Sequence, residues 1–327
     1  EIDEITNQSS IATFENTLEA MENCSDLLER NSALMFNLNS AETSDELQAV
    51  TQDASQLITE FQNDIRLNNA LFNRIKYIFE NEDHQKLNTE QLTLLEKEYK
   101  GFVRNGALLS KSEKEKLREI DSEKAKLGLT FGENVLADSQ AFELHISDES
   151  QLKGLPESAK EMAAEMANSK NKQGWIFTLD YPSYIPFMTY IENRELRKGM
   201  SIAFGKRGFQ ENDCNNTEVI LKLVGLRNER AKLLGYESHA AFVLEERMAQ
   251  SEEKVTDFLE DLYEKALPSA TLEWEEMKQF AKSNLQIDTI EKWDTTYISE
   301  KLKQAQLKLD EQELKPYFSL EKVQSGL

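Results

Sequence analysis

The three histidines are the residues of this chain with the widest catalytic use, and they are His84, His145 and His239. A zinc-binding HExxH helix needs two histidines four residues apart, so that both rings face one metal ion, and a glutamate beside the metal-bound water. No two of these histidines have that spacing, so the printed sequence contains no HExxH motif. Because a lone histidine seldom binds a metal, we expect His84 and His145 to be solvated. His239 is expected to make a structural hydrogen bond near a helix start.

Other catalytic motifs are also missing from the printed sequence. It contains no GxSxG nucleophile elbow, no GxxxxGK[ST] phosphate loop and no GxGxxG fingerprint. The segment "AFGKRGF" places two basic residues between Gly205 and Gly208, but it follows a helical pattern, so a surface turn is the better interpretation. The acidic run "LEERMAQSEEK" is more typical of a solvated helix face than of a two-carboxylate catalytic site.

The aromatic residues of "FTLDYPSYIPFMTYIENRELR" are better candidates for a functional site. Tyr184, Phe187, Met188 and Ile191 share one helical face, and Tyr181 precedes them in a loop fixed by proline. One interpretation is core packing, which aromatic side chains at helical spacing usually provide. The alternative makes Tyr181 and Tyr184 part of a cleft wall that contacts peptide. These two tyrosines are the substrate-channel candidates, and the sequence predicts no catalytic and no metal-binding residue.

Helices are expected to position these side chains. Residues 1–100 contain neither glycine nor proline, the residues that most often interrupt helices, so this stretch should be a succession of helices. Thr43 or Ser44, and Thr89, are the predicted N-caps. A further helix runs through "SEKEKLREIDSEKAKLGLTF". Its predicted buried face consists of Leu117, Ile120, Leu127 and Phe131.

About forty residues then break the helical pattern. "AFELHIS" alternates between apolar and polar residues, and "WIFTL" is a short β-prone run, with a helix from near Pro156 between them. The predicted fold class is therefore mainly α, a multi-helix protein with a small β-hairpin-like sheet near 141–147 and 175–179. We predict an N-terminal helical region at 1–137, a small α/β insertion at 138–182 and a helical region at 183–327. In the last region, Pro268 is predicted to bend a pair of helices.

Composition excludes several classes of protein. The chain has 327 residues, 39% of them apolar, which is enough for a substantial core. Its 38 basic and 60 acidic residues give a net charge of −22, so nucleic acid and anionic membranes would be repelled. Cys24 and Cys214 form no CxxC pair, and we expect both thiols to be reduced and buried. No apolar run is long enough to span a bilayer.

Seven blocks of sequence, in order along nearly the whole chain, resemble one family. They are "NDIRLNNALFNRIKYIFE", "LLEKEYKGFVRNGALLS", "FGENVLADSQAFELHISDESQLKGLPES", "GWIFTLDYPSYIPFMTYIENRELR", "NNTEVILKLVGLRNERAKLLGY", "RMAQSEEKVTDFL" and "WDTTYISEKLKQAQLKLDEQELKPYFSLEKVQSGL". They are similar to blocks of the thimet oligopeptidase family of zinc metallopeptidases. Within it, "FVRNGALLS" favours the bacterial peptidyl-dipeptidases, also called dipeptidyl carboxypeptidases, over the sister oligopeptidase A group.

The resemblance implies a hydrolase in which a zinc-bound water, activated by the HExxH glutamate, attacks a peptide carbonyl and releases a carboxy-terminal dipeptide. In that family the HExxH segment follows the block that resembles "LKPYFSLEKVQSGL". We therefore expect this chain to be an amino-terminal fragment that leads toward a missing catalytic domain. Zinc is the expected cofactor of the full-length parent, and no zinc is expected in this fragment, which should be inactive.

The expected partners of the parent are short unfolded peptides, with no nucleic acid and no membrane. Its expected location is the cytoplasm, and a periplasmic or exported location is the alternative if a signal peptide has been removed, since the first residue is Glu1. The alternative function is a non-catalytic helical binding or scaffold protein. Peptide specificity and oligomeric state stay open at this point.

Overall fold

The structure, a computed structural model, describes residues 2–81, 84–308, 314 and 317–326. It is mainly helical with one small two-stranded sheet, which confirms the predicted fold class. The chain forms two compact units, residues 1–136 with 216–255 (unit 1) and residues 137–215 with 256–327 (unit 2). Each unit is described by itself. The division into 1–137, 138–182 and 183–327 stays a prediction.

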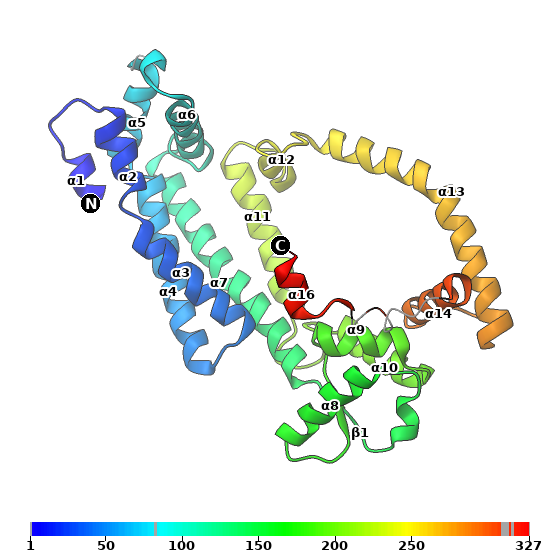
Figure 1. Cartoon of the computed structure of the whole chain (residues 1–327). Helices are drawn as coiled ribbons and strands as arrows, with labels where there is room; N and C mark the ends of the chain where they lie inside the picture. Colours follow the sequence, from blue (N-terminus) through cyan, green and yellow to red (C-terminus); the bar gives the residue numbers. More distant parts are fainter. Residues whose placement is uncertain (1, 82–83, 309–313, 315–316, 327) are drawn as a thin grey trace. The chain divides into compact units, whose positions relative to one another are not determined.

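Unit 1 is built of helices. They are α1 (Ile2–Thr6), the π-helix η1 (Glu15–Glu19), α2 (Ala20–Glu22), α3 (Asp26–Ala41), α4 (Asp45–Arg66), α5 (Asn69–Asn81), the 3-10 helix η2 (His84–Lys86), α6 (Thr89–Arg104), most of α7 (Lys111–Ala141), α11 (Thr217–Leu233) and α12 (His239–Leu244). Figure 1 shows α3, α4 and α7 side by side. Glu133 of α7 joins them, because its carboxylate accepts hydrogen bonds from Asn39 of α3 at 3.4 Å and from Gln52 of α4 at 2.9 Å.

Two helix starts test the predicted N-caps. The Ser44 hydroxyl accepts a hydrogen bond from the Leu47 amide at 3.2 Å, which confirms Ser44 as the cap of α4. The prediction of Thr89 is wrong by one residue. Asn88 caps α6 instead, in a reciprocal capping box with Gln91. The asparagine side chain reaches the third amide of the helix from an extended backbone, so Thr89 becomes the first helical residue.

The core of unit 1 lies mainly between α5 and α6, and includes Leu71, Phe72, Ile75, Ile78, Leu95 and Phe102. Of the predicted buried face of α7, three members are buried, Leu117, Ile120 and Leu127. The fourth prediction is wrong, because Phe131 is 40% exposed. The backbone and side chains next to Phe131 make polar contacts instead, since the Phe131 carbonyl accepts a hydrogen bond from Asn216 at 3.0 Å and Asn134 donates to Asn216 at 2.8 Å.

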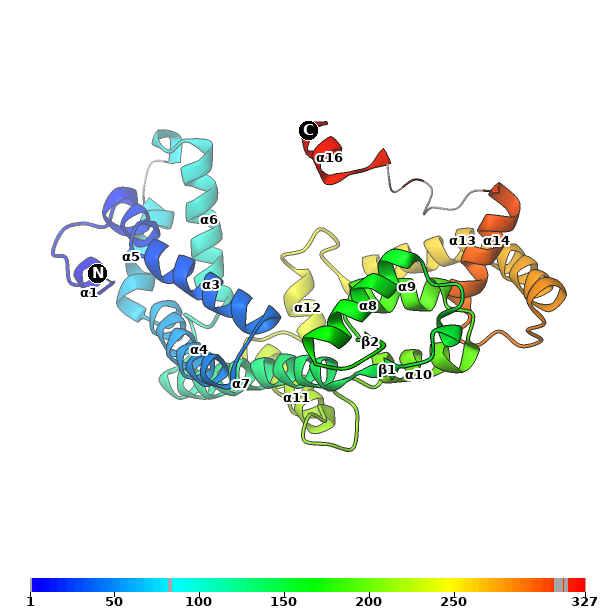
Figure 2. The same cartoon turned by 60° about the horizontal axis from the view of Figure 1, so that its bottom comes forward.

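Unit 2 contains the sheet and its covering helices. Its elements are β1 (Leu144–Ile146), the 3-10 helix η3 (Glu149–Leu152), α8 (Glu157–Ser169), β2 (Trp175–Phe177), α9 (Tyr181–Tyr190), α10 (Arg194–Gly205), the larger part of α13 (Glu252–Leu285), α14 (Thr295–Leu307) and α16 (Leu320–Ser325). The strands pair antiparallel, with Leu144 opposite Phe177, and this confirms the small sheet that the sequence predicted. Figure 2 shows α8 and α9 beside this sheet. Their shared core includes Phe177, Phe187 and Met188.

Helix α13 differs from the expected pair of helices. It is one helix of 34 residues, and Pro268 lies inside it. Proline removes one backbone donor and disturbs one turn, but the remaining hydrogen bonds of so long a helix continue on both sides. No described helix is both long and apolar enough to cross a lipid bilayer.

The two cysteines, Cys24 and Cys214, form no disulfide bond, and each is only half-buried. The expectation that both side chains are buried is therefore wrong. Cys24 donates a hydrogen bond to the Met21 carbonyl at 3.1 Å at the end of α2. Helix ends leave such carbonyls without helical partners, and this keeps the thiol near the surface.

Replacement of Gly154 by alanine should destabilise unit 2. Gly154 has a φ of +93°, and a Cβ there would clash with the Tyr190 carbonyl oxygen at the end of α9. The left-handed backbone alone costs about 1–3 kcal/mol for a residue with a side chain. Gly128→Ala is the matched control, because nothing lies within 4 Å of its Cβ position in α7, and alanine should stabilise that helix by up to about 1 kcal/mol. Urea unfolding of the two variants should therefore shift in opposite directions, and equal shifts would contradict this account.

Candidate functional site

Tyr181 and Tyr184, the predicted channel residues, lie in the first turn of α9 and have different environments. The Tyr181 ring is 66% exposed. Tyr184 is half-buried and stacks on Phe204 of α10, with ring centroids 4.2 Å apart. Burial raises the pKa of Tyr184, although its hydrogen bond with Ser201 and the nearby Arg207 charge act in the opposite direction. Core packing therefore holds Tyr184, while Tyr181 presents its ring at the surface.

The Phe204 ring lies close to the rings of both tyrosines and to the guanidinium group of Arg207. Its ring centroid lies 6.0 Å from that of Tyr181, and the Arg207 guanidinium carbon lies 3.6 Å from the Phe204 centroid. Arg207 also donates to the Phe204 carbonyl at 3.0 Å and to the Ser139 hydroxyl at 3.3 Å. This stack gives Tyr181 a rigid base, which favours contact with an apolar or aromatic side chain of a ligand.

The other end of α9 is fixed by a buried charged network. Arg197 and Asp294 are 1% and 0% exposed. Arg197 donates to Asp294 Oδ1 at 3.1 Å, and to the carbonyls of Ile191 at 2.7 Å and Glu192 at 3.0 Å. It also donates to the Trp293 carbonyl at 3.2 Å. One side chain of α10 therefore connects the residues that follow α9 with Trp293 and Asp294, the residues just before α14.

Arg194 completes the network. Its guanidinium donates to both carboxylate oxygens of Asp294, at 2.6 Å from Nη2 to Oδ2 and 3.0 Å from Nε to Oδ1, and to the Thr289 carbonyl at 2.9 Å. Burial acts to raise the pKa of Asp294, but the hydrogen bonds from Arg194, the Glu291 amide and Arg197 outweigh it, and the pKa lies below its ordinary value. Asp294 is therefore a carboxylate at neutral pH.

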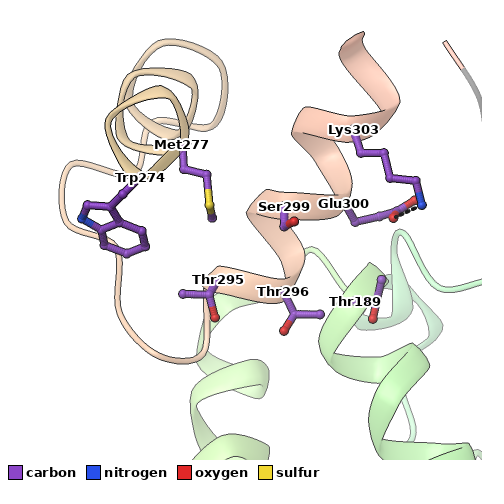
Figure 3. A pocket seen from close by; sticks show the side chains of 8 residues that line it. All are labelled: Thr189, Trp274, Met277, Thr295, Thr296, Ser299, Glu300 and Lys303. Carbon is purple, nitrogen blue, oxygen red and sulfur yellow. Dashed lines mark ion pairs between the residues drawn. The ribbon is translucent and has the colours of Figure 1, made fainter. Parts of the chain in front are cut away.

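Residues that follow Asp294 line an open pocket in unit 2, shown in Figure 3. Its volume is about 480 Å³, and its lining residues are Thr189, Trp274, Met277, Thr295, Thr296, Ser299, Glu300 and Lys303. Trp274 and Met277 come from α13 and face the row of side chains on α14, while Thr189 comes from α9. The Arg197–Asp294 network sets the distance between α9 and α14, so it also shapes this pocket.

The polar groups of the pocket are partly engaged. The hydroxyls of Thr189 and Thr295 donate to the carbonyls of Ile185 at 2.8 Å and Lys292 at 3.0 Å. Glu300 accepts a hydrogen bond from Gln304 and lies 3.6 Å from the Lys303 ammonium group. The pocket therefore offers hydroxyls to polar groups of a ligand and the indole and thioether of α13 to apolar ones. That combination suits an extended peptide with an apolar side chain.

None of the three histidines lines this pocket. His84 and His145 are exposed, and their Nε2 atoms lie 3.1 Å and 2.6 Å from the carbonyls of Phe79 and Gln173. His239 is the first residue of α12, as predicted, and lies beside Phe242. Burial, followed by the charges of Arg227, Lys124 and Arg230, lowers the pKa of His239.

Zinc does not fit the residues that the structure describes. Within those ranges, no three histidine, cysteine, aspartate or glutamate side chains are grouped so that they could hold a metal ion. The carboxylate of Asp294 is already taken by two arginines, and that of Glu300 by Gln304 and Lys303. No step of metal-assisted chemistry is therefore assigned to this part of the chain.

Sequence reasoning missed the network and the pocket. The segment "ENRELR" contains both arginines, and Asp294 precedes two threonines in "WDTT", a pattern typical of a helix start. These signals place each residue on its element, but they do not pair residues that are 97 positions apart. Trp274 was likewise visible only as one residue of a long acidic helix.

Comparison with known proteins places the chain among peptidases by similarity. Residues 187–327 match the model of peptidase family M3. This match includes Phe187 and everything after it, and so includes α10, α14 and all the residues that line the pocket of Figure 3.

Curated relatives match over nearly the whole chain. Oligopeptidase A of Escherichia coli is 31% identical over 100% of this chain and 48% of its own length, and dipeptidyl carboxypeptidase of the same organism is 30% identical over 99% and 48%. The thimet-like oligopeptidase of Dictyostelium discoideum is 28% identical over 96% and 47%. The chain thus spans about half the length of the curated relatives it matches. The resemblance predicted from the sequence is confirmed, and the near-equal identities do not separate the first two kinds of peptidase.

Removal of the Asp294 charge should destabilise unit 2 strongly and in a pH-dependent way. Asp294→Asn leaves Arg197 buried without its counter-ion, which typically costs about 3–5 kcal/mol at pH 7. Because the folded-state pKa of Asp294 is lowered, its contribution is present above the unfolded pKa of about 3.9 and is lost as pH falls through the folded value. The difference in unfolding free energy between wild type and variant should therefore shrink below about pH 4. A difference in unfolding free energy that is constant from pH 7 to pH 3 would contradict this prediction.

Proposed function

The chain belongs, through residues 187–327, to peptidase family M3, and from that premise we propose that it supplies about half of a peptidase that hydrolyses short peptides. The half proposed here binds and positions the substrate. The zinc-binding part is supplied by sequence that this chain does not contain. Release of carboxy-terminal dipeptides belongs to the same proposal, as does a cytoplasmic location.

One observation carries the proposal. Every residue of the chain lies within the alignment with oligopeptidase A of Escherichia coli, and that alignment covers 48% of the relative. A match of this extent, in one continuous order, is much more specific than a short motif. Probable cytosolic oligopeptidase A of Arabidopsis thaliana is 33% identical over 95% of the chain, and its name supports the cytoplasmic location.

The structure supports a substrate-binding role for unit 2. We propose that Tyr181 and Tyr184 form part of a wall that contacts peptide. Tyr181 would contact the substrate with its exposed ring, and Tyr184 would act behind it by fixing Phe204. The hydroxyls and the indole of the Figure 3 pocket offer a second surface of the kind that extended peptides use. Short unfolded peptides are the proposed partners, and a net charge of −22 disfavours nucleic acid.

The chain alone should be catalytically silent under this proposal. Its sequence has no HExxH motif, and the described residues hold no group of side chains that fits zinc. Peptide hydrolysis at neutral pH requires an activated water and a polarised carbonyl, which metallopeptidases obtain from the metal. The proposal assigns that chemistry to none of the residues that the structure describes.

A second candidate is a helical binding or scaffold protein without catalysis. The exposed apolar side chains along α13 favour it, because large uncovered apolar surfaces often mark protein-binding sites. This candidate predicts that the natural protein that carries the sequence binds other proteins and hydrolyses nothing.

Zinc content and peptide hydrolysis distinguish the two candidates. The natural protein that carries this sequence, purified from its own cells, should contain about one zinc ion per chain and should cleave short quenched peptides until a chelator is added. The recombinant 327-residue chain, incubated with zinc, should do neither. Zinc-dependent cleavage by the recombinant chain would overturn the proposal, and a zinc-free, inactive natural protein would favour the scaffold.

Tyr181→Ala, in the active natural protein, should weaken peptide binding without unfolding unit 2. The exposed ring contributes to substrate contact and not to the core, so KM should rise by about 5-fold to 10-fold, as expected from the loss of roughly 1 kcal/mol of aromatic contact, with little change in kcat. Tyr77→Ala is the control, because Tyr77 is a 45% exposed tyrosine of α5 in unit 1. An unchanged KM for Tyr181→Ala would remove Tyr181 from the proposed wall.

A further inference from the structure

Helix α13 carries a continuous apolar face along most of its length. Two rows of residues with steps of four form it between positions 258 and 274. The first row is Phe258, Leu262, Ala266, Ala270 and Trp274, and the second is Leu259, Tyr263 and Leu267. In an α-helix such rows lie next to each other on one side. The large side chains of both rows are between 40% and 64% exposed.

The same face is covered at its C-terminal end. Met277, Phe280, Ala281 and Leu285 continue it, and they pack in the small core that also contains Tyr297 and Ile298 of α14. Ala281 is fully buried there, and Gln306 of α14 donates to Glu276 of α13. The pocket of Figure 3 lies at the junction, since Trp274 and Met277 face α14 at the point where the covered part of the face gives way to the uncovered part.

The uncovered part is too long and too apolar to be incidental. From position 258 to 274 the helix rises by about 24 Å at 1.5 Å per residue. Single exposed apolar side chains are ordinary on a protein surface, but a long stripe of aromatic, leucine and alanine side chains usually marks an interaction site. The stripe also continues a face that already buries its C-terminal end against a helix, so a second helix is the natural cover.

We propose that this face of α13, from Phe258 to Trp274, is the docking surface for the part of an M3 peptidase that this chain does not contain. The proposal rests on the proposed function above. The length of the match identifies this occupant. The whole chain aligns with only 48% of oligopeptidase A of Escherichia coli, so about as many residues of that relative again lie outside the match. The occupant is a helical segment with an apolar stripe that extends along α13 from the end where α14 packs.

Charge also selects this occupant over a second copy of the chain. The side of α13 opposite the stripe carries Asp257, Glu260, Asp261 and Glu264, and the whole chain has a net charge of −22. Two such chains repel each other over the Debye length at low salt. Glu273 lies within the apolar face and makes no ion pair with any residue that the structure describes, so a lysine or arginine of the occupant should lie opposite it.

Hydrogen exchange of residues 256–274 tests the docking surface. The samples are the natural protein purified from its own cells and the recombinant 327-residue chain. We expect amides of this segment to exchange at least 10-fold more slowly in the natural protein. The segment around Leu57 of α4, another exposed leucine, is the control and should exchange alike in both samples.

Three outcomes would overturn the proposal. They are equal exchange of residues 256–274 in the two samples, a natural protein whose mass shows no residues beyond this chain, and protection in the recombinant chain that grows with its concentration. The last outcome would identify a second copy as the occupant. Peptide hydrolysis is measured on the same samples. If the natural protein is active but residues 256–274 are not protected, the proposed function stands and the docking surface is wrong. If these residues are protected but the natural protein is inactive, the docking surface stands and the proposed function is wrong.

Leu259→Glu combined with Leu262→Glu gives a second, independent test. Glutamate preserves helix propensity and places two charges on the stripe. Expressed from its own gene, the natural protein with this pair should lose the slow exchange of residues 256–274 by 10-fold or more. Leu57→Glu is the matched control and should leave it unchanged. Slow exchange that persists in the double variant, with α-helical content intact by circular dichroism, would contradict the assignment.

Discussion

A carboxylate with no exposed surface has to be matched by cations, and in unit 2 that requirement governs the arrangement of the helices. Asp294 forms ion pairs with Arg197, which is itself buried, and with the half-exposed Arg194. The free-energy cost of removing two charges from water is offset only when their geometry is good and the remaining donors are used in hydrogen bonds. Here they are used, because Arg197 also donates to the carbonyls that follow α9 and to the residue before Asp294. The guanidinium carbon lies 4.1 Å from the Tyr297 ring centroid as well.

This network fixes the parts of unit 2 that a ligand would meet. The first residues of α14 follow Asp294 directly, and they line the pocket together with Thr189 of α9 and Trp274 of α13. At the other end of α9, the stack of Tyr184 on Phe204 holds the exposed ring of Tyr181. The described residues thus provide surfaces for binding and contain no group that fits zinc. Such a division between a positioning part and a part that carries the metal agrees with the proposed function.

Local patterns in the sequence predicted the elements well, because they depend on neighbouring residues. The two strands, the helix after Pro156 and the Ser44 cap were all visible from alternation, periodicity and capping chemistry. Two predictions from local patterns were wrong. Phe131 is exposed although its spacing places it on the face of Leu117, Ile120 and Leu127, and α13 is one helix that contains Pro268 instead of a pair of helices. The pairing of Arg197 with Asp294, 97 positions apart, depends on the fold and had no signal in the sequence alone.

A double-mutant cycle on Arg197 and Asp294 tests most directly whether this interaction organises unit 2. Unfolding free energies of the wild type, Arg197→Met, Asp294→Leu and the double variant give the coupling between the two side chains. The account predicts that each single variant is strongly destabilised, because Asp294→Leu leaves the buried Arg197 without its counter-ion and Arg197→Met leaves the buried Asp294 with the half-exposed Arg194 alone. The double variant should recover much of that loss, with a coupling of about 2 kcal/mol or more. Additive effects, with a coupling within about 0.5 kcal/mol of zero, would contradict the account.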